Sequence, residues 1–321
     1  MNGPPAGVSV IVPVFNEEKN LEPLDERIRI ALESLDRPYE IVYVDDGSTD
    51  GSWTVLKQTA TLHPDVRLVR LRKNFGQAAA LAAGFAHSRH PILVTLDADL
   101  QNDPSDIPRL VEALGEATDL VAGWRRHRQD PWLMRRVPSV VANVLTRAVT
   151  GLPLHDFGCT LRAYRREVIQ DVRLFGEMHR FLPVLVAGVG GRIVEMEVRH
   201  HPRRHGVSKY GFFRTYKVIV DLLTLKFIGE FSSRPTYVFG GFGLISFVLG
   251  LLALAVVAYR VLVLKHLEAT PLVFFMVVFF LAGTFSIFIG FLAEMMIRAT
   301  YESLGRATYF VRETVGLDDR S

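Results

Sequence analysis

Two aspartates one residue apart carry the strongest chemical signal in the sequence. Residues 92–96 form a short apolar run that leads directly into Asp97, Ala98 and Asp99. A run of this length is typical of a parallel strand that is buried on both faces. Carboxylates after such a strand lie at the edge where open α/β sheets bind ligands. Their hard oxygens suit Mg²⁺ or Mn²⁺ shared with a phosphate group, whereas an isolated pair would equally fit a helix cap.

Two more polar loops follow apolar runs of the same kind. The first run covers residues 8–14 and the second covers residues 39–44. Because the carboxyl ends of parallel strands meet at one edge, we expect all three loops to converge on one crevice. Carboxylates accept hydrogen bonds from ring N–H groups and sugar hydroxyls, so the first two loops could hold a base and a ribose. The residues assigned to this role are Pro13, Phe15, Asn16, Glu17 and Asp46.

The elements that position these loops alternate along the first part of the chain. Strand-like runs separated by helical segments predict a doubly wound, mostly parallel α/β sheet. Asn16 is the candidate N-cap of the first helix, with acidic residues in the first turn. The predicted strands cover 8–14, 39–44, 66–71, 92–96 and 120–123, and the predicted helices cover 16–35, 52–63 and 77–87.

The last third of the chain is apolar and has a different architecture. Neither 235–259 nor 269–293 contains Asp, Glu, Lys or Arg. As a helix, each run would be about 37 Å long, enough to span a bilayer. The two runs predict a transmembrane hairpin, preceded by an amphipathic helix at the membrane interface. The predicted divisions are a catalytic domain (1–210), a juxtamembrane helix (211–234), two transmembrane helices (235–297) and a cytoplasmic tail (298–321).

Charge and composition limit the location and the partners. The formal net charge is +3, and basic residues flank the apolar runs, which favours a cytoplasmic catalytic domain in the inner or plasma membrane. No apolar leader precedes the first predicted strand, and the single Cys159 fits a reducing compartment. Beside a bilayer, anionic lipids and phosphorylated ligands are a better match for the basic residues than nucleic acid, so we expect no nucleic-acid partner.

At this point the chain resembles the family-2 glycosyltransferases with the GT-A fold, over roughly residues 8–210. The motifs are Val-Pro-Val-Phe-Asn-Glu, Val-Asp-Asp-Gly-Ser-Thr-Asp, Asn-Phe-Gly-Gln and Asp-Ala-Asp-Leu-Gln. With Arg204-His-Gly-Val-Ser-Lys209-Tyr and two apolar spans, it is similar to the polyprenyl-phosphate glycosyltransferases, which include dolichyl-phosphate mannose synthases and bacterial undecaprenyl-phosphate glucosyl- and aminoarabinosyl-transferases. The stretch 156–166 is closest to the aminoarabinose type. The Gln-x-x-Arg-Trp motif of processive relatives is absent from the sequence.

The resemblance implies an inverting enzyme that moves one sugar from a UDP- or GDP-type donor to polyprenyl phosphate. Lipid phosphate is already a nucleophile, so the site must mainly screen charge and stabilise the departing nucleotide diphosphate. The implied roles follow. Asp99 and Asp97 bind Mg²⁺ or Mn²⁺; Gln101, Arg204 and Lys209 join the donor site; Arg125 and Arg126 grip the lipid phosphate; and Asp156 positions the acceptor or acts as a base.

Several alternatives stay open at this level. Arg125 and Arg126 would also fit a solvated basic turn, and Asp156 would fit a helix cap. The enzyme could act on another lipid or build a short polysaccharide, or the chain could be a nucleotide-sugar-binding scaffold without turnover. His200, His201 and His205 match no common zinc spacing. Residues 307–312 resemble an edge strand, and relatives use such tails to form homo-oligomers such as tetramers.

Overall fold

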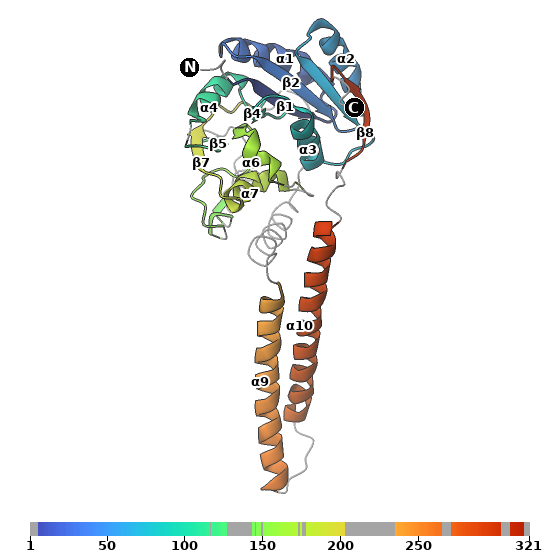
Figure 1. Cartoon of the computed structure of the whole chain (residues 1–321), viewed down its shortest axis with the longest axis vertical. Coiled ribbons are helices and arrows are strands. Elements are labelled where there is room, and N and C mark those ends of the chain that lie inside the picture. The colour runs from blue at the N-terminus through green and yellow to red at the C-terminus, as the bar shows by residue number, and fades with distance from the viewer. Residues whose placement is uncertain are drawn as a thin grey trace. The chain divides into compact units, whose positions relative to one another are not determined.

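A computed structural model shows two compact units. The first comprises Met1–Leu222 with Ala307–Ser321, and the second comprises Leu223–Arg306. Figure 1 shows the mixed α/β unit and the two long helices. The residues that the structure describes are 6–115, 117–126, 143–144, 146–148, 150–172, 174, 178–202, 235–264, 271–302 and 309–317. Arg204, Lys209 and the predicted interfacial helix (211–234) lie outside them.

The first unit is built on a sheet with the strand order β7-β5-β6-β4-β1-β2-β3-β8 among the described residues. Strand β6 runs antiparallel to β4 and β5, β8 runs antiparallel to β3, and the other neighbouring pairs are parallel. The mostly parallel sheet is therefore confirmed. The strands are β1 (Val8–Val14), β2 (Tyr39–Asp45), β3 (Val66–Leu71), β4 (Ile92–Thr95), β5 (Leu120–Trp124), β6 (Arg162–Arg165), β7 (Ile193–Glu197) and β8 (Val311–Val315).

Helices cover both faces of this sheet (Figure 1). Side chains alternate along β1, so Val10 and Val12 join the core under α1, α2 and α4, while Ile11 joins the core under α3, α6 and α7. Burial on both faces explains why these strands are continuously apolar. The helices are α1 (Glu18–Glu33), α2 (Ser52–Leu62), α3 (Gln77–His87), η1 (Pro104–Asp106), α4 (Ile107–Ala113), α6 (Arg166–Gln170), η3 (Met178–Phe181) and α7 (Leu182–Gly188).

The prediction that Asn16 caps the first helix is wrong. Helix α1 begins at Glu18, and Glu17 occupies the N-cap position without a side-chain cap bond. Asn16 instead has a φ of +58°, in the left-handed region that asparagine tolerates better than most residues. Its side chain is used to join two loops of the candidate site.

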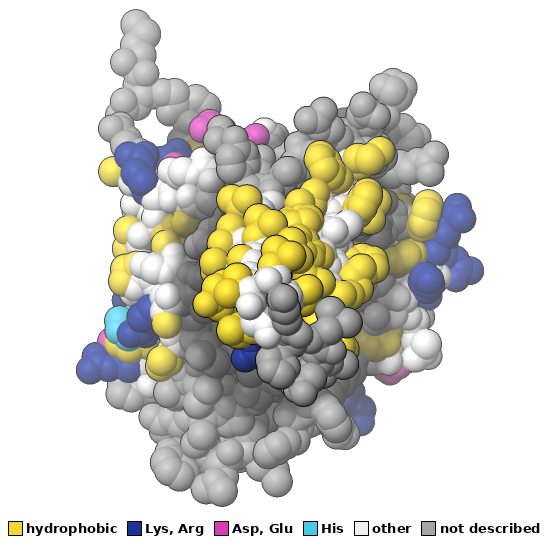
Figure 2. Space-filling view, turned by 90° about the horizontal axis from the view of Figure 1, so that it is seen from below, with side chains coloured by type: hydrophobic (Ala, Val, Ile, Leu, Met, Phe, Trp, Pro, Cys, Tyr) yellow, Lys and Arg dark blue, Asp and Glu magenta, His cyan; other side chains and the backbone are white. Residues whose placement is uncertain are grey.

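The second unit consists of α9 (Pro235–Leu262) and α10 (Pro271–Glu302). Segments Phe239–Leu262 and Pro271–Ala293 are long and apolar enough to cross a membrane. Ser286 Oγ donates a 2.7 Å hydrogen bond to the Phe239 carbonyl, which ties the two helices together. Large hydrophobic side chains on both helices are exposed, and Figure 2 shows hydrophobic side chains gathered where this unit is seen from below. Such a surface suits lipid better than water.

Candidate active site at the carboxyl edge of the sheet

The sheet topology brings the polar loops to one edge. Strands β1, β2 and β4 are parallel, and β5 is parallel to β4 because both are antiparallel to β6. The loops that follow these four strands therefore leave from the same edge. The turn that enters β6 lies there as well, because β6 runs in the opposite direction. This edge holds Phe15, Asn16 and Glu17, Asp46, Asp97 and Asp99, Arg125 and Arg126, and Asp156; Pro13 lies within β1, close to its end.

The loops after β1 and β2 are bonded to each other. Asn16 Oδ1 accepts a 2.8 Å hydrogen bond from the backbone N–H of Thr49, and Asn16 N donates to Ser48 Oγ at 3.0 Å. Glu17 N donates to Ser52 Oγ, also at 3.0 Å. These bonds join the two loops into one wall of the candidate site. Phe15, half-buried, belongs to the same wall.

Asp46 shapes the next loop along the edge. Its Oδ1 and Oδ2 accept hydrogen bonds from the backbone N–H groups of Phe75 at 2.7 Å and Gly76 at 2.9 Å. The side chain is buried, and both of its oxygens are used by this loop. These two bonds position the loop 74–76 at the N-terminus of α3.

Gly47 lets the loop after β2 lie directly against the backbone of Lys73 and Asn74. This close approach gives a testable prediction. It has a φ of +71°, and a Cβ there would lie 2.5 Å from the Lys73 carbonyl carbon. We expect Gly47→Ala to destabilise the fold by about 2–4 kcal/mol, from left-handed strain and overlap. Gly115→Ala is the matched control, because a Cβ there meets nothing within 4 Å. Thermal unfolding of the full chain in detergent measures both, and equal melting temperatures would contradict the prediction.

The two aspartates after β4 have fixed orientations. Asp97 Oδ1 accepts a 2.7 Å hydrogen bond from Gln77 Nε2, and Asp99 Oδ1 accepts a 3.1 Å bond from the Gln101 backbone N–H. Leu100, which lies between Asp99 and Gln101, has a φ of +59°, which is uncommon for a bulky residue. Strain of this kind persists where surrounding structure holds it, and it concentrates at functional sites.

These carboxylates fit a hard divalent cation shared with a ligand. Mg²⁺ is usually bound through one or two carboxylates, and it keeps water and substrate phosphates as its other ligands. Within the described ranges, no three His, Cys, Asp or Glu side chains gather to form a complete metal site. The donor set at Asp97 and Asp99 is thus suited to an ion that arrives with a phosphorylated ligand.

Arg125 and Asp156 form a buried, bidentate ion pair. The Arg125 Nε and Nη2 atoms donate to Asp156 Oδ2 and Oδ1 at 2.8 and 3.0 Å, and Gly158 N donates to Oδ1 at 3.0 Å. Burial alone lowers the pKa of Arg125, but the charge of Asp156, with help from Cys159 and Asp97, raises the pKa above its ordinary value. The guanidinium therefore stays charged, and the geometry favours a positioning role for Asp156 rather than that of a base.

Arg126 differs from Arg125 in being exposed. Its side chain is 58% exposed, bonds to Glu197 at 2.6 Å, and lies over the Trp124 ring at 5.6 Å from the centroid. Exposed ion pairs of this kind are weak, so an anionic ligand can compete for the guanidinium. Of the two arginines predicted to grip a phosphate, Arg126 is the accessible one, while Arg125 is committed to Asp156.

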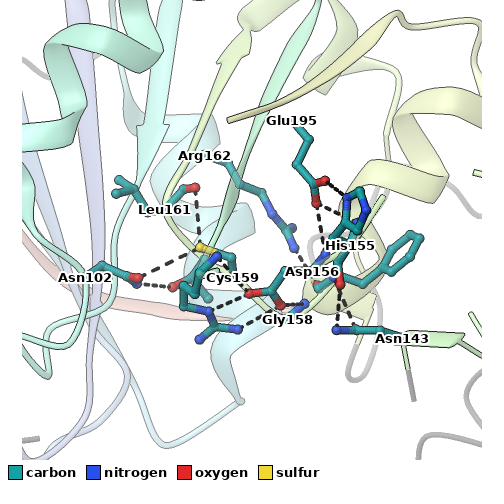
Figure 3. A network of polar contacts seen from close by, with 12 residues as sticks. Asn102, Asn143, His155, Asp156, Gly158, Cys159, Leu161, Arg162 and Glu195 are labelled. Carbon is teal, nitrogen blue, oxygen red and sulfur yellow. Dashed lines mark hydrogen bonds and ion pairs between the residues drawn. The ribbon is translucent and has the colours of Figure 1, made fainter. Parts of the chain in front are cut away.

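Three polar residues in this region were not identified from the sequence. Arg162 is buried at the start of β6 and donates to the carbonyls of Phe157 and His179 at 2.7 and 3.1 Å. Glu195 and His155 bond to each other beside Asp156 (Figure 3). The only signal for Glu195 was the alternation of apolar and acidic residues along β7. Arg162 left no signal, because its partners are backbone carbonyls.

Cys159 is buried behind the Asp156 turn, close to Asn102 (Figure 3). Burial raises the pKa of its thiol to about 11. Because the thiolate is the reactive form, we expect no alkylation by iodoacetamide at pH 8 in the native protein and complete alkylation after unfolding. Mass spectrometry of the intact chain distinguishes the two states. Rapid alkylation of the native protein would show that the turn is open.

The mixed sheet, the helices on both faces and the paired carboxylates after β4 agree with the GT-A fold expected from the sequence. Residues 9–173 match the family model described as glycosyl transferase family 2. The chain belongs to this family, and the fold and the enzyme class predicted from the sequence are confirmed.

Several relatives match nearly the whole chain. It is 42% identical to a dodecaprenyl-phosphate galacturonate synthase of Rhizobium johnstonii, over 98% of this chain and 94% of the relative. It is 37% identical to an undecaprenyl-phosphate 4-deoxy-4-formamido-L-arabinose transferase of Edwardsiella ictaluri, over 96% and 94%.

Solved structures support the fold. Glucosyl-3-phosphoglycerate synthase from Mycobacterium tuberculosis, crystallised with Mn²⁺, UDP and phosphoglyceric acid, matches with a TM-score of 0.55 and 22% identity. The match covers 69% of this chain and 78% of that one. At this identity the likeness shows the shared architecture of the sheet and its helices.

Proposed function

We propose that this chain transfers a single sugar from a nucleotide diphosphate sugar to a polyprenyl phosphate at a membrane surface. One observation carries the proposal. The match to relatives named for polyprenyl-phosphate substrates extends over 96–98% of the chain, so it includes the carboxylate edge of the sheet and the two apolar helices. A soluble donor and a lipid acceptor together require both parts.

The donor half of the site would use a divalent cation. Asp99, with Asp97, would hold Mg²⁺ or Mn²⁺, which neutralises the diphosphate as it leaves. The wall formed by Asn16, Glu17 and the Asp46-supported loop would hold the nucleoside. Because these groups serve the leaving diphosphate, attack from the opposite side would invert the anomeric centre.

The acceptor half of the site would serve a phosphate that is already nucleophilic. A phosphate monoester with a second pKa near 6 is mostly a dianion at neutral pH, so no strong base is needed. Arg126 offers an exposed guanidinium for this anion. Asp156, both of whose oxygens bond to Arg125, would act by fixing the position of the loop and not by removing a proton.

The membrane placement extends the same proposal. Residues 235–297 would cross the inner or plasma membrane twice, with residues 1–210 and the tail 298–321 in the cytoplasm and 211–234 at the interface. A homo-oligomer stays a prediction. The tail strand β8 pairs with β3 of its own chain in this structure.

The proposal is tested by the chemistry of the lipid product. Membranes containing the full chain are incubated with labelled UDP- and GDP-sugars, and the lipid extract is treated with mild acid or mild alkali. We expect the label to be released by acid and to resist alkali, as a sugar linked through a prenyl phosphate should. Label released by alkali would indicate a glycerolipid acceptor, label in a polymer would indicate a synthase, and no lipid label would leave the scaffold hypothesis.

A further inference from the structure

The imidazole ring of His155 is exposed and yet held in a fixed orientation. Its Nδ1 lies 2.7 Å from Glu195 Oε2, and its ring stacks on the indole of Trp124, with centroids 4.3 Å apart and an interplanar angle of 19°. The side chain is 50% exposed, whereas that of Glu195 is only 11% exposed. In the part of the chain that the structure describes, no group bonds to Nε2 of His155. Among the described residues, this nitrogen is therefore available to a ligand.

Glu195 organises the whole turn around this ring. Its Oε1 accepts hydrogen bonds from the backbone N–H groups of His155 at 2.7 Å and Asp156 at 2.9 Å, while Oε2 faces the imidazole (Figure 3). The two backbone bonds would suffice to hold the turn. The third contact fixes the orientation of the ring, which is how carboxylates commonly prepare a functional histidine. Because the imidazole is half exposed, solvent screens this contact and its contribution to stability is modest.

Two guanidinium groups, those of Arg125 and Arg126, lie close to His155, and each is paired with a carboxylate. The next residue, Asp156, holds Arg125, and the indole that stacks on His155 also packs against the guanidinium of Arg126. The carboxylates of the turn are engaged, since Asp156 bonds to Arg125 and Glu195 bonds to the turn itself. Among the described residues, the imidazole of His155 and the guanidinium of Arg126 both pack on Trp124 and are at least half exposed, and Arg126 also pairs with Glu197.

We propose that His155 binds the phosphate of the lipid acceptor through Nε2, and that Glu195 is the residue that positions it. This inference rests on the proposed function. With Nδ1–H donated to Glu195, Nε2 and a phosphate oxygen can share one proton, whether that proton arrives on the imidazole or on the phosphate. A different phosphate oxygen forms the bond to the anomeric carbon, and the bond from that carbon to the nucleoside diphosphate breaks. His155 takes part in neither bond.

The test compares three variants of the full chain in detergent. His155→Phe keeps an aromatic ring on Trp124 but removes Nε2, and His155→Gln restores a polar nitrogen at a similar distance from the backbone. His87→Phe is the control, because His87 ends α3 at the opposite edge of the sheet.

For His155→Phe we expect the KM for undecaprenyl phosphate to rise about 10–100-fold. A rise of this size corresponds to the loss of one hydrogen bond to a charged group. The KM for the nucleotide sugar and the melting temperature should stay unchanged, and His155→Gln should recover part of the loss.

Direct binding separates this inference from the proposed function. Calorimetric titration with farnesyl phosphate and with farnesol is carried out on the same variants. His155→Phe should weaken binding of the phosphate and leave binding of the alcohol unchanged. Unchanged lipid KM and unchanged phosphate binding in His155→Phe would overturn the role of His155, as would equal rises of both KM values with a lower melting temperature. Failure of the unaltered chain to transfer sugar would instead overturn the proposed function.

Discussion

Asp99→Asn should abolish sugar transfer, lowering kcat/KM by about 10³-fold or more, because the cation that neutralises the leaving diphosphate loses its main anionic ligand. The fold should survive, since Asn can still accept the hydrogen bond that Gln101 N donates to Asp99 Oδ1. Transfer assays over a range of Mn²⁺ concentrations, with melting temperatures, measure both effects.

Asp119→Asn is the matched control for this experiment. Asp119 immediately precedes β5, at the opposite edge of the sheet, and its carboxylate accepts a 2.8 Å hydrogen bond from Arg192 N. This variant should transfer sugar at the rate of the unaltered chain. If Asp99→Asn retained a tenth or more of the activity, the carboxylate edge would not be the place where the cation works.

Asp156→Asn should have its largest effect on stability. It leaves the buried guanidinium of Arg125 without its counter-charge, which costs about 3–5 kcal/mol, or roughly 6–20 °C in melting temperature for a unit of this size. Transfer should fall as well, because the turn that carries His155 loses its anchor. Thermal unfolding in detergent and initial rates of transfer measure the two losses.

The double variant Asp156→Asn with Arg125→Gln tests the cause. With the charge of Arg125 also removed, the double variant should be more stable than Asp156→Asn alone, since the two residues form one interaction. If Asp156→Asn instead kept the melting temperature of the unaltered chain and lost only kcat, Asp156 would be a general base.

The sequence predicted the central strands because their cause is local. β1, β2 and β3 are buried on both faces, and their continuous apolar runs reveal this directly. β6 and β7 escaped prediction because Arg162, Arg165, Glu195 and Glu197 interrupt the apolar pattern. Tertiary contacts offset this polarity: backbone carbonyls accept hydrogen bonds from the Arg162 guanidinium, and Glu195 bonds to a distant turn.

In the candidate site, too, some placements follow from the local sequence and others depend on tertiary contacts. The placement of Asp97 and Asp99 could be predicted, because strand order and chain direction determine which loops share an edge. The pairing of Arg125 with Asp156 could not, because 31 residues separate them and each has an independent interpretation in the sequence. His155 was overlooked because its orientation depends on a carboxylate 40 residues away.

The mass of the product tests the central claim most directly. Purified full chain, undecaprenyl phosphate and Mn²⁺ are combined with each member of a panel of UDP- and GDP-sugars, and the lipid is analysed by mass spectrometry. One nucleotide sugar should give a lipid heavier than the acceptor by a single sugar residue, with the phosphate retained, and only when the cation is present. An unchanged acceptor with every donor, or a series of products carrying several sugars, would contradict the account.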